Sequence, residues 1–590
     1  MKPLKRVERL VVILLLLVAW WLRWAQLLDV PPGWRDDDLI ELYTFSARIM
    51  QEGPELYFAG ASGHEPLYHT LRAPLVAAAG VNAASARLMS ASAGLLAIVL
   101  TWAVGRRVLG RGPGVLGAAL VTVSFWSLMY SRVAIRHMGA LPWMLLALYW
   151  AWRILRDRHW PPGATVGLAV GTAGSLLTYY AGRLMPALLI VLYPAIVPED
   201  VRSIVRYALA KLRQGGTPPR LPGASSPIPR HRLQRRLQRY MLGLGLGILL
   251  SAPMFWAASR IPGADARVSE VAIPLTALLD GDIRPLLQTT WTTLGMFHAK
   301  GDPEWLYNYS ERPVFGPVGA TLFYLSLLIG LIRWRRPASR FLLLWLIVGI
   351  SPAFISLPPS SYGHCILALP AVYLLLASPL RTLTDQIKQR RHWHSMATAI
   401  GLGLICVIGV RDLADYFVKW PEHSMVQFLY RADYRALAHH LCDGSGGARQ
   451  VGVGSMLYGV WDRVALRTDC AEAALHARWF NPERAIVFAR GQAAPVYLQH
   501  EGNRHPQIAE LIAKAQPIAE PTGMEAYQVK PWLPPTGAAS HTTEGVALAS
   551  QPLADAIQLE AAAWVGDPTP GSSASIATWW PIKGELPLPP

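Results

Sequence analysis

The chain has 590 residues, of which 52% are hydrophobic and only 16% charged, and its formal net charge is +17. This composition is too apolar for an ordinary soluble enzyme, and the 23 tryptophans and 21 tyrosines suit the aromatic belts of a membrane protein. The positive charge does not indicate nucleic-acid binding, because much of it falls in short segments between apolar stretches, and no RNA-binding motif or zinc-finger spacing accompanies it.

Apolar segments of roughly 15–24 residues recur along the first two thirds of the chain, and each is long enough to predict a membrane-spanning helix. The first is basic and then apolar, but it is long, rich in tryptophan and without a clear small-residue cleavage site, so we expect a retained anchor. The eleven predicted spans lie near residues 8–28, 83–105, 114–130, 138–155, 163–181, 184–198, 240–258, 314–332, 341–357, 365–380 and 395–410.

Alternate connections between these spans are basic, which places them in the cytoplasm by the positive-inside rule. They are residues 1–9, 106–111, 153–158, 199–239, 333–340 and 381–394. The other connections then face outward, as does everything after residue 410; they are residues 29–82, 131–137, the region around 182, 259–313 and 358–364. The sequence therefore predicts an α-helical, multi-pass protein of the plasma (inner) membrane, with a membrane domain at 1–410 and a basic cytoplasmic loop at 199–239.

The chain after residue 410 is expected to be extracytoplasmic. Residues 411–535 have the character of a soluble α/β domain, with helices near 434–441 and 507–515 and strands near 450–454 and 485–489, whereas 536–590 is a strand-like tail. Cys442 and Cys470 lie in the α/β region, either as a disulfide, if it is outside the cytoplasm, or as free thiols. No CxxC spacing predicts structural zinc.

The outward loop 29–82 is too apolar for a floating linker. Residues 38–51 and 65–79 have mostly helical apolar spacing and predict two amphipathic helices at the outer membrane surface. Asp36 or Asp37 is expected to cap the first of them. Ionisable groups so near a membrane are costly unless they face water, a partner or a substrate, which makes this loop the first candidate for a functional site.

The outward connections together carry carboxylates and cations. A carboxylate can accept the proton of an attacking hydroxyl, and Arg or Lys can stabilise the departing phosphate of a lipid-linked sugar. The candidate catalytic residues are Asp36, Asp37, Asp38 and Glu65, and the candidate substrate-binding residues are His64, Arg132, Arg136, His137, Tyr179, Tyr180, Arg183, Arg267, His298, Lys300 and His364.

Each group also has a structural interpretation. The aspartates could be a helix-capping cluster, Arg132 and Arg136 could bind lipid headgroups, and Tyr179 and Tyr180 could belong to an aromatic belt. His298 and Lys300 could be loop surface. His64, Glu65 and His137 could hold a divalent metal, although their spacing matches no known signature, and no other cofactor is expected.

Several of these segments resemble GT-C glycosyltransferases of the family 39 type, which includes the dolichyl-phosphate-mannose protein mannosyltransferases and the bacterial aminoarabinose-lipid transferases. The Asp-rich turn with Gly-His-Glu-Pro-Leu-Tyr at 63–68 resembles their first outward loop. The segments that resemble the bacterial branch are Tyr130-Ser131-Arg132 with Arg136, Tyr179-Tyr180 with Arg183, and residues 294–313 and 368–372. The resemblance covers roughly residues 1–430.

The resemblance implies a GT-C transmembrane catalytic domain at 1–410. It would transfer a monosaccharide from a polyprenyl-phosphate donor to a hydroxyl of a glycan, lipid or protein acceptor on the extracytoplasmic face, with inversion. Asp37 or Asp38 would be the base and Glu65 would assist. This chain has Asp-Asp-Asp where members often have Asp-Glu, and His364 where an Arg is expected.

The same resemblance relates residues 545–580 to the opening strands of a β-sandwich found in some relatives. Three other functions remain as alternatives: a transporter or flippase of lipid-linked sugars, a ligase or polymerase of lipid-linked glycans, and a noncatalytic scaffold whose outward domain binds a partner.

Overall fold

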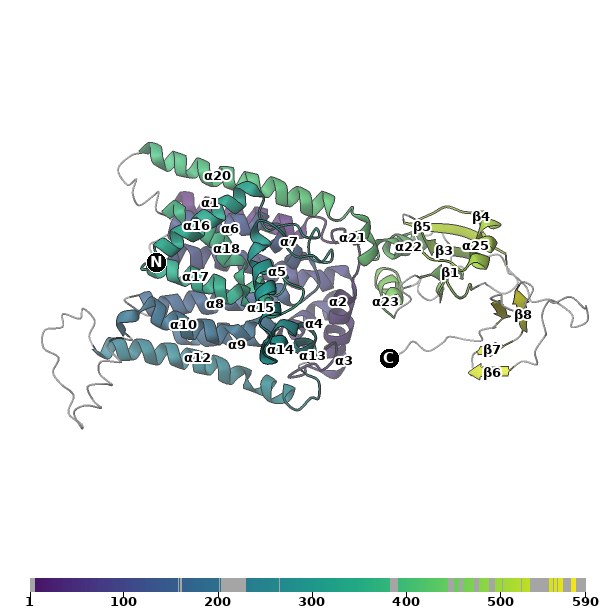
Figure 1. Ribbon diagram of the computed structural model, residues 1–590, viewed down its shortest axis with the longest axis horizontal. Coiled ribbons are helices and arrows are strands. Elements are labelled where there is room, and N and C mark those ends of the chain that lie inside the picture. The colour runs from purple at the N-terminus through teal and green to yellow at the C-terminus, as the bar shows by residue number, and fades with distance from the viewer. Residues whose placement is uncertain are drawn as a thin grey trace, which may run out of the picture. The chain divides into compact units, whose positions relative to one another are not determined.

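The computed structural model describes residues 6–157, 159, 162–200, 202, 230–264, 266–381, 391–443, 450–455, 460–471, 477–487, 494–500, 502–521, 523–530, 551–554, 557–559, 561–565 and 575–579. The chain forms two compact units, Met1–Ala432 and Asp433–Pro590. The first consists of helices and loops, whereas the second also contains strands (Figure 1).

The helices of the first unit follow in chain order. The first half contains α1 (Arg6–Trp24), α2 (Asp36–Leu39), the π-helix η1 (Ile40–Ala47), α3 (Arg48–Glu52), α4 (Leu67–Ala79), α5 (Ala83–Val108), α6 (Arg111–Val123), α7 (Phe125–Arg132), α8 (His137–Arg156), α9 (Ala164–Leu176), η2 (Tyr180–Leu184) and α10 (Met185–Ile196). The rest contains α12 (Arg230–Ala258), α13 (Ala266–Val271), α14 (Ile273–Leu279), α15 (Arg284–Leu294), η3 (Gly295–Phe297), α16 (Pro317–Ile332), α17 (Pro337–Ile350), η4 (Ser351–Phe354), η5 (Ile366–Ala368), α18 (Leu369–Ala377), α20 (Arg391–Ala414), the π-helix η6 (Asp415–Lys419) and α21 (Ser424–Leu429).

A helix lies on each of the eleven apolar segments predicted from the sequence. Five of the described helices are long and apolar enough to cross a membrane, and the bent pair α6–α7 would be a sixth; the five are Ala83–Val108, His137–Arg156, Leu233–Ala258, Pro337–Phe354 and Met396–Lys419. Four further apolar helices are shorter: Ala164–Leu176, Tyr180–Ile196, Pro317–Ile332 and Ile366–Arg381. The chain is thus mainly helical with several apolar helices, and the number of eleven spans stays a prediction.

The helices of the first unit pack side by side as a bundle (Figure 1). α5 packs against α6 and α8, α8 against α9, and α9 against α12, while α6 packs against α18 and α20. Small residues allow the closest approach, because a Cβ added to Gly171 of α9 would lie 2.5 Å from the backbone nitrogen of Ala147 in α8. Glycine at such crossings is typical of helices packed within a membrane.

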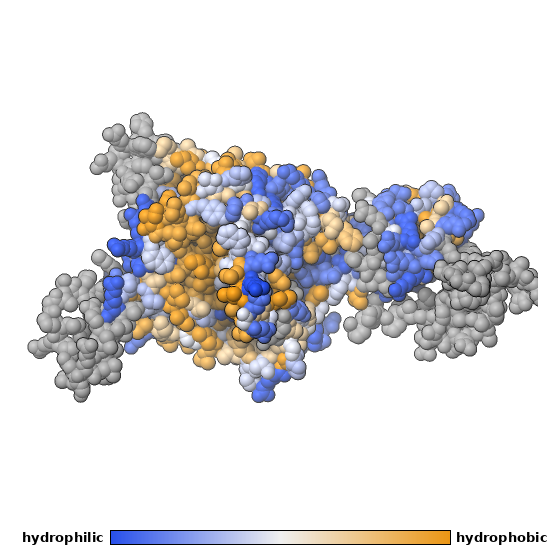
Figure 2. Space-filling model, in the orientation of Figure 1, coloured by the Kyte–Doolittle hydropathy of each residue, from blue (hydrophilic) through white to orange (hydrophobic). Residues whose placement is uncertain are grey.

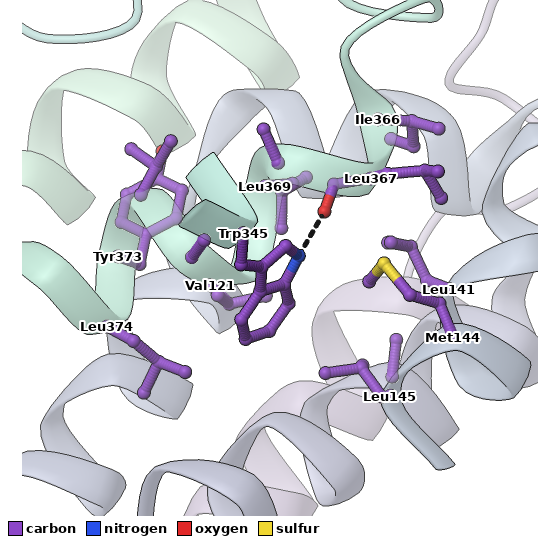
Figure 3. Packing of buried hydrophobic residues seen from close by; sticks show 14 of the residues in the cluster. Val121, Leu141, Met144, Leu145, Trp345, Ile366, Leu367, Leu369, Tyr373 and Leu374 are labelled. Carbon is purple, nitrogen blue, oxygen red and sulfur yellow. Dashed lines mark hydrogen bonds between the residues drawn. The ribbon is translucent and has the colours of Figure 1, made fainter. Parts of the chain in front are cut away.

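The bundle has a large buried hydrophobic core. Trp345 of α17 lies at its centre, among Val121 of α6 and Leu141, Met144 and Leu145 of α8 (Figure 3). Its indole Nε1 donates to the carbonyl oxygen of Leu367 at 2.8 Å, so the polar atom of this buried side chain is satisfied.

The outer surface of the bundle is also apolar, as lipid contact requires. Figure 2 shows a broad hydrophobic surface over the helices, bordered by hydrophilic residues at the ends of the bundle. α12 contributes Leu242, Leu249, Leu250 and Trp256, each more than half exposed. Hydrophobic residues this exposed indicate a surface that lipid covers.

The second unit contains a five-stranded sheet in the order β2-β1-β3-β5-β4. Its strands are β1 (Val451–Gly454), β2 (Ala477–Phe480), β3 (Ala494–Gln499), β4 (Gln516–Pro517) and β5 (Met524–Val529), and its helices are α22 (Ala432–Cys442), α23 (Val460–Asp469) and α25 (Pro506–Ala513). β1 pairs in parallel with β2 and β3, while β5 is antiparallel to β3 and β4. Cys442 and Cys470 form a disulfide, with their Cα atoms 6.2 Å apart.

Two hairpins follow: β6 (Gln551–Ala554) with β7 (Ile557–Leu559), and β8 (Ala561–Val565) with β9 (Ser575–Trp579). The helices and the first strand predicted in the α/β region are present as α22, α25 and β1. The strand predicted at 485–489 is wrong where it can be checked, because residues 485–487 belong to no strand and 488–489 lie outside the described residues. The strand that pairs with β1 at this side of the sheet is instead β3.

Candidate functional site

The loop between α1 and α2 is held by buried arginines that bind backbone carbonyls. Arg87 of α5 donates to the carbonyl oxygens of Leu27 (2.9 Å), Pro31 (3.1 Å) and Gly33. Arg132, at the end of α7, donates to those of Leu22 (2.9 Å), Gln26 (2.8 Å) and Val30 (3.0 Å). Arg132, a candidate for substrate binding, is therefore a fully buried support of the loop that leads to the aspartates.

The three aspartates lie in the first turn of α2, whose N-cap residue is Arg35, without a side-chain capping bond. Asp36 is exposed and pairs with Arg431 at 2.5 Å. Asp38 is fully buried: its Oδ1 accepts from Arg35 Nη2 at 3.0 Å and from the backbone nitrogen of Ala134 at 3.0 Å. These contacts tie α2 to the segment between α7 and α8, so Asp38 contributes to the packing of the loop.

Asp37 is exposed like Asp36, but it accepts a hydrogen bond from a neutral phenol and is not paired with an arginine among its described contacts. Tyr307 donates its phenol hydrogen to Asp37 Oδ2 at 2.6 Å. The Arg35 guanidinium lies 4.6 Å from the centre of the Tyr307 ring. Burial, with Asp37 as the next cause, holds the pKa of Tyr307 well above its usual range, so the phenol stays protonated and remains a donor to Asp37.

A row of rings leads from Asp37 to the second outward connection. The Tyr307 ring stacks parallel on Tyr130, with centroids 5.7 Å apart. Tyr130 lies 5.5 Å from His137, and His137 lies 4.2 Å from Tyr179. The Arg136 guanidinium is 5.6 Å from the centre of the Tyr179 ring. Ring contacts through Tyr130, His137 and Tyr179 therefore connect Tyr307, which holds Asp37, with Arg136.

Arg136 is the centre of a buried ionic cluster. It contacts Glu41 Oε1 at 2.9 Å, His64 Nδ1 at 2.9 Å and Glu65 Oε2 at 3.5 Å. Arg183 lies 3.4 Å from Glu65 Oε1. Five of the groups needed for acid–base and anion chemistry thus come together, although the carboxylates nearest to the arginines are the two glutamates and not the aspartates.

Arg183 is the more accessible of the two arginines in this cluster, with 21% of its side chain exposed against 10% for Arg136. Its guanidinium carbon lies 3.8 Å from the centre of the Tyr180 ring. The flat face of a guanidinium stacks well on an aromatic ring while its edge remains able to donate. This geometry suits binding of an anion at the edge of the cluster.

Glu41 was not among the residues singled out from the sequence. Burial raises its pKa to about 7, even though Arg136 and Arg72 lower it. Its backbone oxygen accepts from Arg72, which also donates to Ser46 Oγ at 2.7 Å. The signal available in the sequence was a carboxylate one helical turn after the aspartates, in the otherwise apolar run 39–42. Nothing in the sequence distinguished Tyr307.

The described side-chain contacts of the remaining candidates are with other residues, although His364 follows Gly363, whose carbonyl oxygen accepts from Tyr179 Oη at 3.4 Å. His298 Nδ1 lies 2.8 Å from Tyr324 Oη, and Lys300 forms an exposed ion pair with Glu311 at 2.9 Å. His364 Nδ1 lies 2.8 Å from Ser356 Oγ. Arg267 lies in α13, and its side chain is outside the described residues.

A metal site was an open alternative for His64, Glu65 and His137. Among the residues that the structure describes, no three His, Cys, Asp or Glu side chains are grouped as metal ligands. His64 and Glu65 both contact Arg136, and a guanidinium at that position competes with a cation for the same lone pairs.

The family model described as dolichyl-phosphate-mannose-protein mannosyltransferase matches residues 64–213. No curated protein matches the chain. Several solved structures are similar to it.

One is the Archaeoglobus fulgidus oligosaccharyltransferase tethered with an acceptor peptide, at 15% identity and a TM-score of 0.46, covering 90% of this chain and 74% of that one. Another is ArnT from Cupriavidus metallidurans bound to undecaprenyl phosphate, at 14% identity and a TM-score of 0.42, covering 88% and 97%. The Saccharomyces cerevisiae protein O-mannosyltransferase complex bound to its sugar donor is similar over 43% of this chain and 34% of that one, at 14% identity and a TM-score of 0.34.

The matched segment starts at His64 and includes Glu65, Arg132, Arg136, His137, Tyr179, Tyr180 and Arg183. These residues carried most of the resemblance read from the sequence. Residues 64–213 are therefore similar to the dolichyl-phosphate-mannose-protein mannosyltransferase family, and the resemblance read from the sequence is confirmed for this segment.

Proposed function

We propose that the chain is an integral membrane glycosyltransferase that moves a monosaccharide from a polyprenyl-phosphate donor to an acceptor hydroxyl on the extracytoplasmic face, with inversion at the anomeric carbon. The observation that carries the proposal is the exposed Asp37 carboxylate, held by Tyr307 and joined by a row of rings to the Arg136–Arg183 cluster. Membrane-spanning helices 1–410 form the catalytic domain, and the region after residue 410 lies outside the cytoplasm.

In this mechanism the acceptor oxygen attacks the anomeric carbon while the bond from that carbon to the phosphate oxygen breaks. The acceptor proton passes to Asp37, and the electron pair of the broken bond leaves with the polyprenyl phosphate. The bond to Tyr307 fixes the carboxylate by one oxygen and leaves the other to accept the proton. One displacement of this kind inverts the configuration of the sugar.

The departing phosphate gains negative charge and needs cationic hydrogen-bond donors more than it needs an acid. Arg183 supplies them, since its guanidinium is partly exposed and stacked on Tyr180. Arg136 is more deeply buried and holds Glu41 and Glu65, so it adds positive potential and positions Glu65. Glu65 in turn is available to orient the acceptor.

The decisive variant is Asp37→Asn, which keeps the shape of the side chain and removes the base. We expect release of polyprenyl phosphate from polyprenyl-phosphate sugars to fall roughly 100-fold or more, as is typical for loss of a general base. The purified protein would be incubated with a panel of polyprenyl-phosphate sugars and with membranes that supply the acceptor. The released polyprenyl phosphate would be measured by mass spectrometry.

Asp36→Asn is the matched control, since Asp36 is also exposed but pairs with Arg431. It should retain most of the activity. Full activity of Asp37→Asn, or equal losses in both variants, would refute the assignment of the base. A flippase of lipid-linked sugars would move donor across vesicle membranes without releasing lipid phosphate, so the same measurement separates the two functions.

A further inference from the structure

A cleft lies at the opposite end of the bundle from the aspartates' loop, where α16 turns into α17. It is formed by the ends of α5, α16, α17 and α18, and its lining combines arginine and serine with aliphatic side chains. The lining residues are Leu109, Ile329, Gly330, Arg333, Arg336, Ala338, Ser339, Leu342, Leu375, Ser378 and Arg381.

The turn between α16 and α17 positions two of the arginines. The backbone nitrogen of Arg336 donates to the carbonyl of Arg333 at 2.8 Å, which closes a tight turn between the two helices. Arg333 and Arg336 therefore lie three residues apart on one turn and both line the cleft. The third arginine, Arg381, is fixed from the other side, because its Nη1 donates to the carbonyl of Val108 at 2.8 Å.

The same cleft faces the beginning of α17. Arg336 is the N-cap residue and makes no side-chain capping bond, and Pro337 follows as the first helical residue. The next two residues, Ala338 and Ser339, line the cleft. First-turn amides of a helix and guanidinium groups both favour anions, and phosphate most of all.

The deeper lining is apolar. Leu342 and Leu375 are buried at its base, and Ile329 of α16 is partly exposed. Beside Ile329, α16 also exposes Leu328, Leu331 and Ile332 on the surface of the bundle. The described lining residues include no carboxylate. A ligand that satisfies both parts of the lining has an anionic head and an apolar body.

We propose that this cleft binds the phosphate of an anionic glycerophospholipid, with the acyl chains lying against the bundle. Basic pockets between membrane helices at the cytoplasmic side are suited to such headgroups. The site is separate from the proposed catalytic residues and would hold the α16–α17 turn against α5 and α18.

The test uses the full-length protein in nanodiscs of phosphatidylcholine, titrated with phosphatidylglycerol, with bound lipid counted by native mass spectrometry. Arg333→Gln combined with Arg336→Gln removes two charges from the cleft, and we expect phosphatidylglycerol binding to weaken about tenfold or more. The matched control is Arg335→Gln combined with Arg156→Gln, which removes two exposed charges from residues that do not line the cleft. It should bind as the unmodified protein does.

Equal weakening in the two double variants would overturn the proposal, since general surface charge would then explain the binding. Inorganic phosphate is the second arm: if it displaces phosphatidylglycerol at comparable concentration, the site takes a free anion and the lipid is not its ligand.

Should the cleft variant fail to fold in phosphatidylcholine alone, Arg336→Gln replaces it, because this side chain is exposed and makes no capping bond. Unchanged binding in Arg336→Gln would then count against the proposal.

Discussion

The arginines of the first unit divide by what their guanidinium groups contact. Arg87 and Arg132 donate to backbone carbonyls of the loop after α1, whereas Arg136 and Arg183 contact carboxylates. A carbonyl carries only a partial charge, so the first pair supports the backbone, and the second pair can respond to a change of charge in the site. The sequence grouped Arg132 and Arg136 as candidates for substrate binding and could not reveal this difference.

Glu41 provides a prediction about pH. Its pKa is raised to about 7 by burial, above the usual value near 4.5, so the folded protein binds a proton there that the unfolded chain has lost. Stability contributed by this group therefore falls as the pH rises from about 4.5 through about 7 and then levels off. In Glu41→Gln this part of the pH dependence should be absent.

Thermal unfolding of the purified protein at pH 5 and pH 8 tests this. We expect the drop in melting temperature between the two pH values to be smaller in Glu41→Gln than in the unmodified protein. Parallel melting temperatures in the two proteins would show that Glu41 does not titrate in this interval.

At the scale of elements, the position of the helices could be predicted and their interruptions could not. Apolar segments long enough to span a membrane predicted α5, α8 and α20, because apolar length is a property of the sequence alone. The break of 59° between α6 and α7 depends on Ser124, whose hydroxyl accepts from the backbone nitrogen of Ser127 and starts a new helix. Serine is common within membrane helices, so the residue alone gave no signal.

The same limit applies to the site. The first outward loop was chosen for its carboxylates, and Asp37 is exposed there as the proposed base requires. Tyr307 reaches it from a loop 270 residues later, and Glu41 is distinguished from other glutamates only by its burial against Arg136. Both depend on tertiary contacts, which a single sequence does not contain.

Another element-scale prediction concerns the junction of α20 with α7. Asp412 accepts from the backbone nitrogen of Phe125, at the start of α7, at 2.9 Å and from Arg312 Nη2 at 2.5 Å. Both charged side chains are nearly buried. Asp412→Asn leaves the Arg312 charge incompletely paired, and we expect it to destabilise the first unit by about 3 kcal/mol, as is usual for one half of a buried pair.

Lys419→Gln is the control, because Lys419 is 65% exposed and pairs with Asp415 at the surface of the same helix end. It should cost no more than about 1 kcal/mol. Both changes in the free energy of unfolding can be measured by unfolding the purified proteins in mixed micelles with an increasing fraction of a denaturing detergent. Equal effects of the two substitutions would show that α20 is not anchored through Asp412.

At the scale of the whole molecule, charge distribution and cysteine chemistry lead to the same orientation. By the positive-inside rule, the basic connections predict that the other connections face outward and that the region after residue 410 is also on the outward side. The Cys442–Cys470 disulfide of the second unit is independent of that count. Disulfides persist in oxidising compartments outside the cytoplasm, so both observations support an extracytoplasmic second unit.

Reporter fusions test this orientation. Alkaline phosphatase folds only outside the cytoplasm, where its own disulfides form, so a fusion after Asp443 should be active and a fusion within residues 199–239 should be inactive. Green fluorescent protein at the same two places should give the reverse.

In intact cells, Cys442 and Cys470 should resist alkylation until a reductant is added, and Cys470→Ser should expose Cys442 to the reagent. An inactive phosphatase after Asp443, together with alkylation of both cysteines without reductant, would place the second unit in the cytoplasm; the acceptor would then have to be reached from the other face, and Asp37 could not be its base.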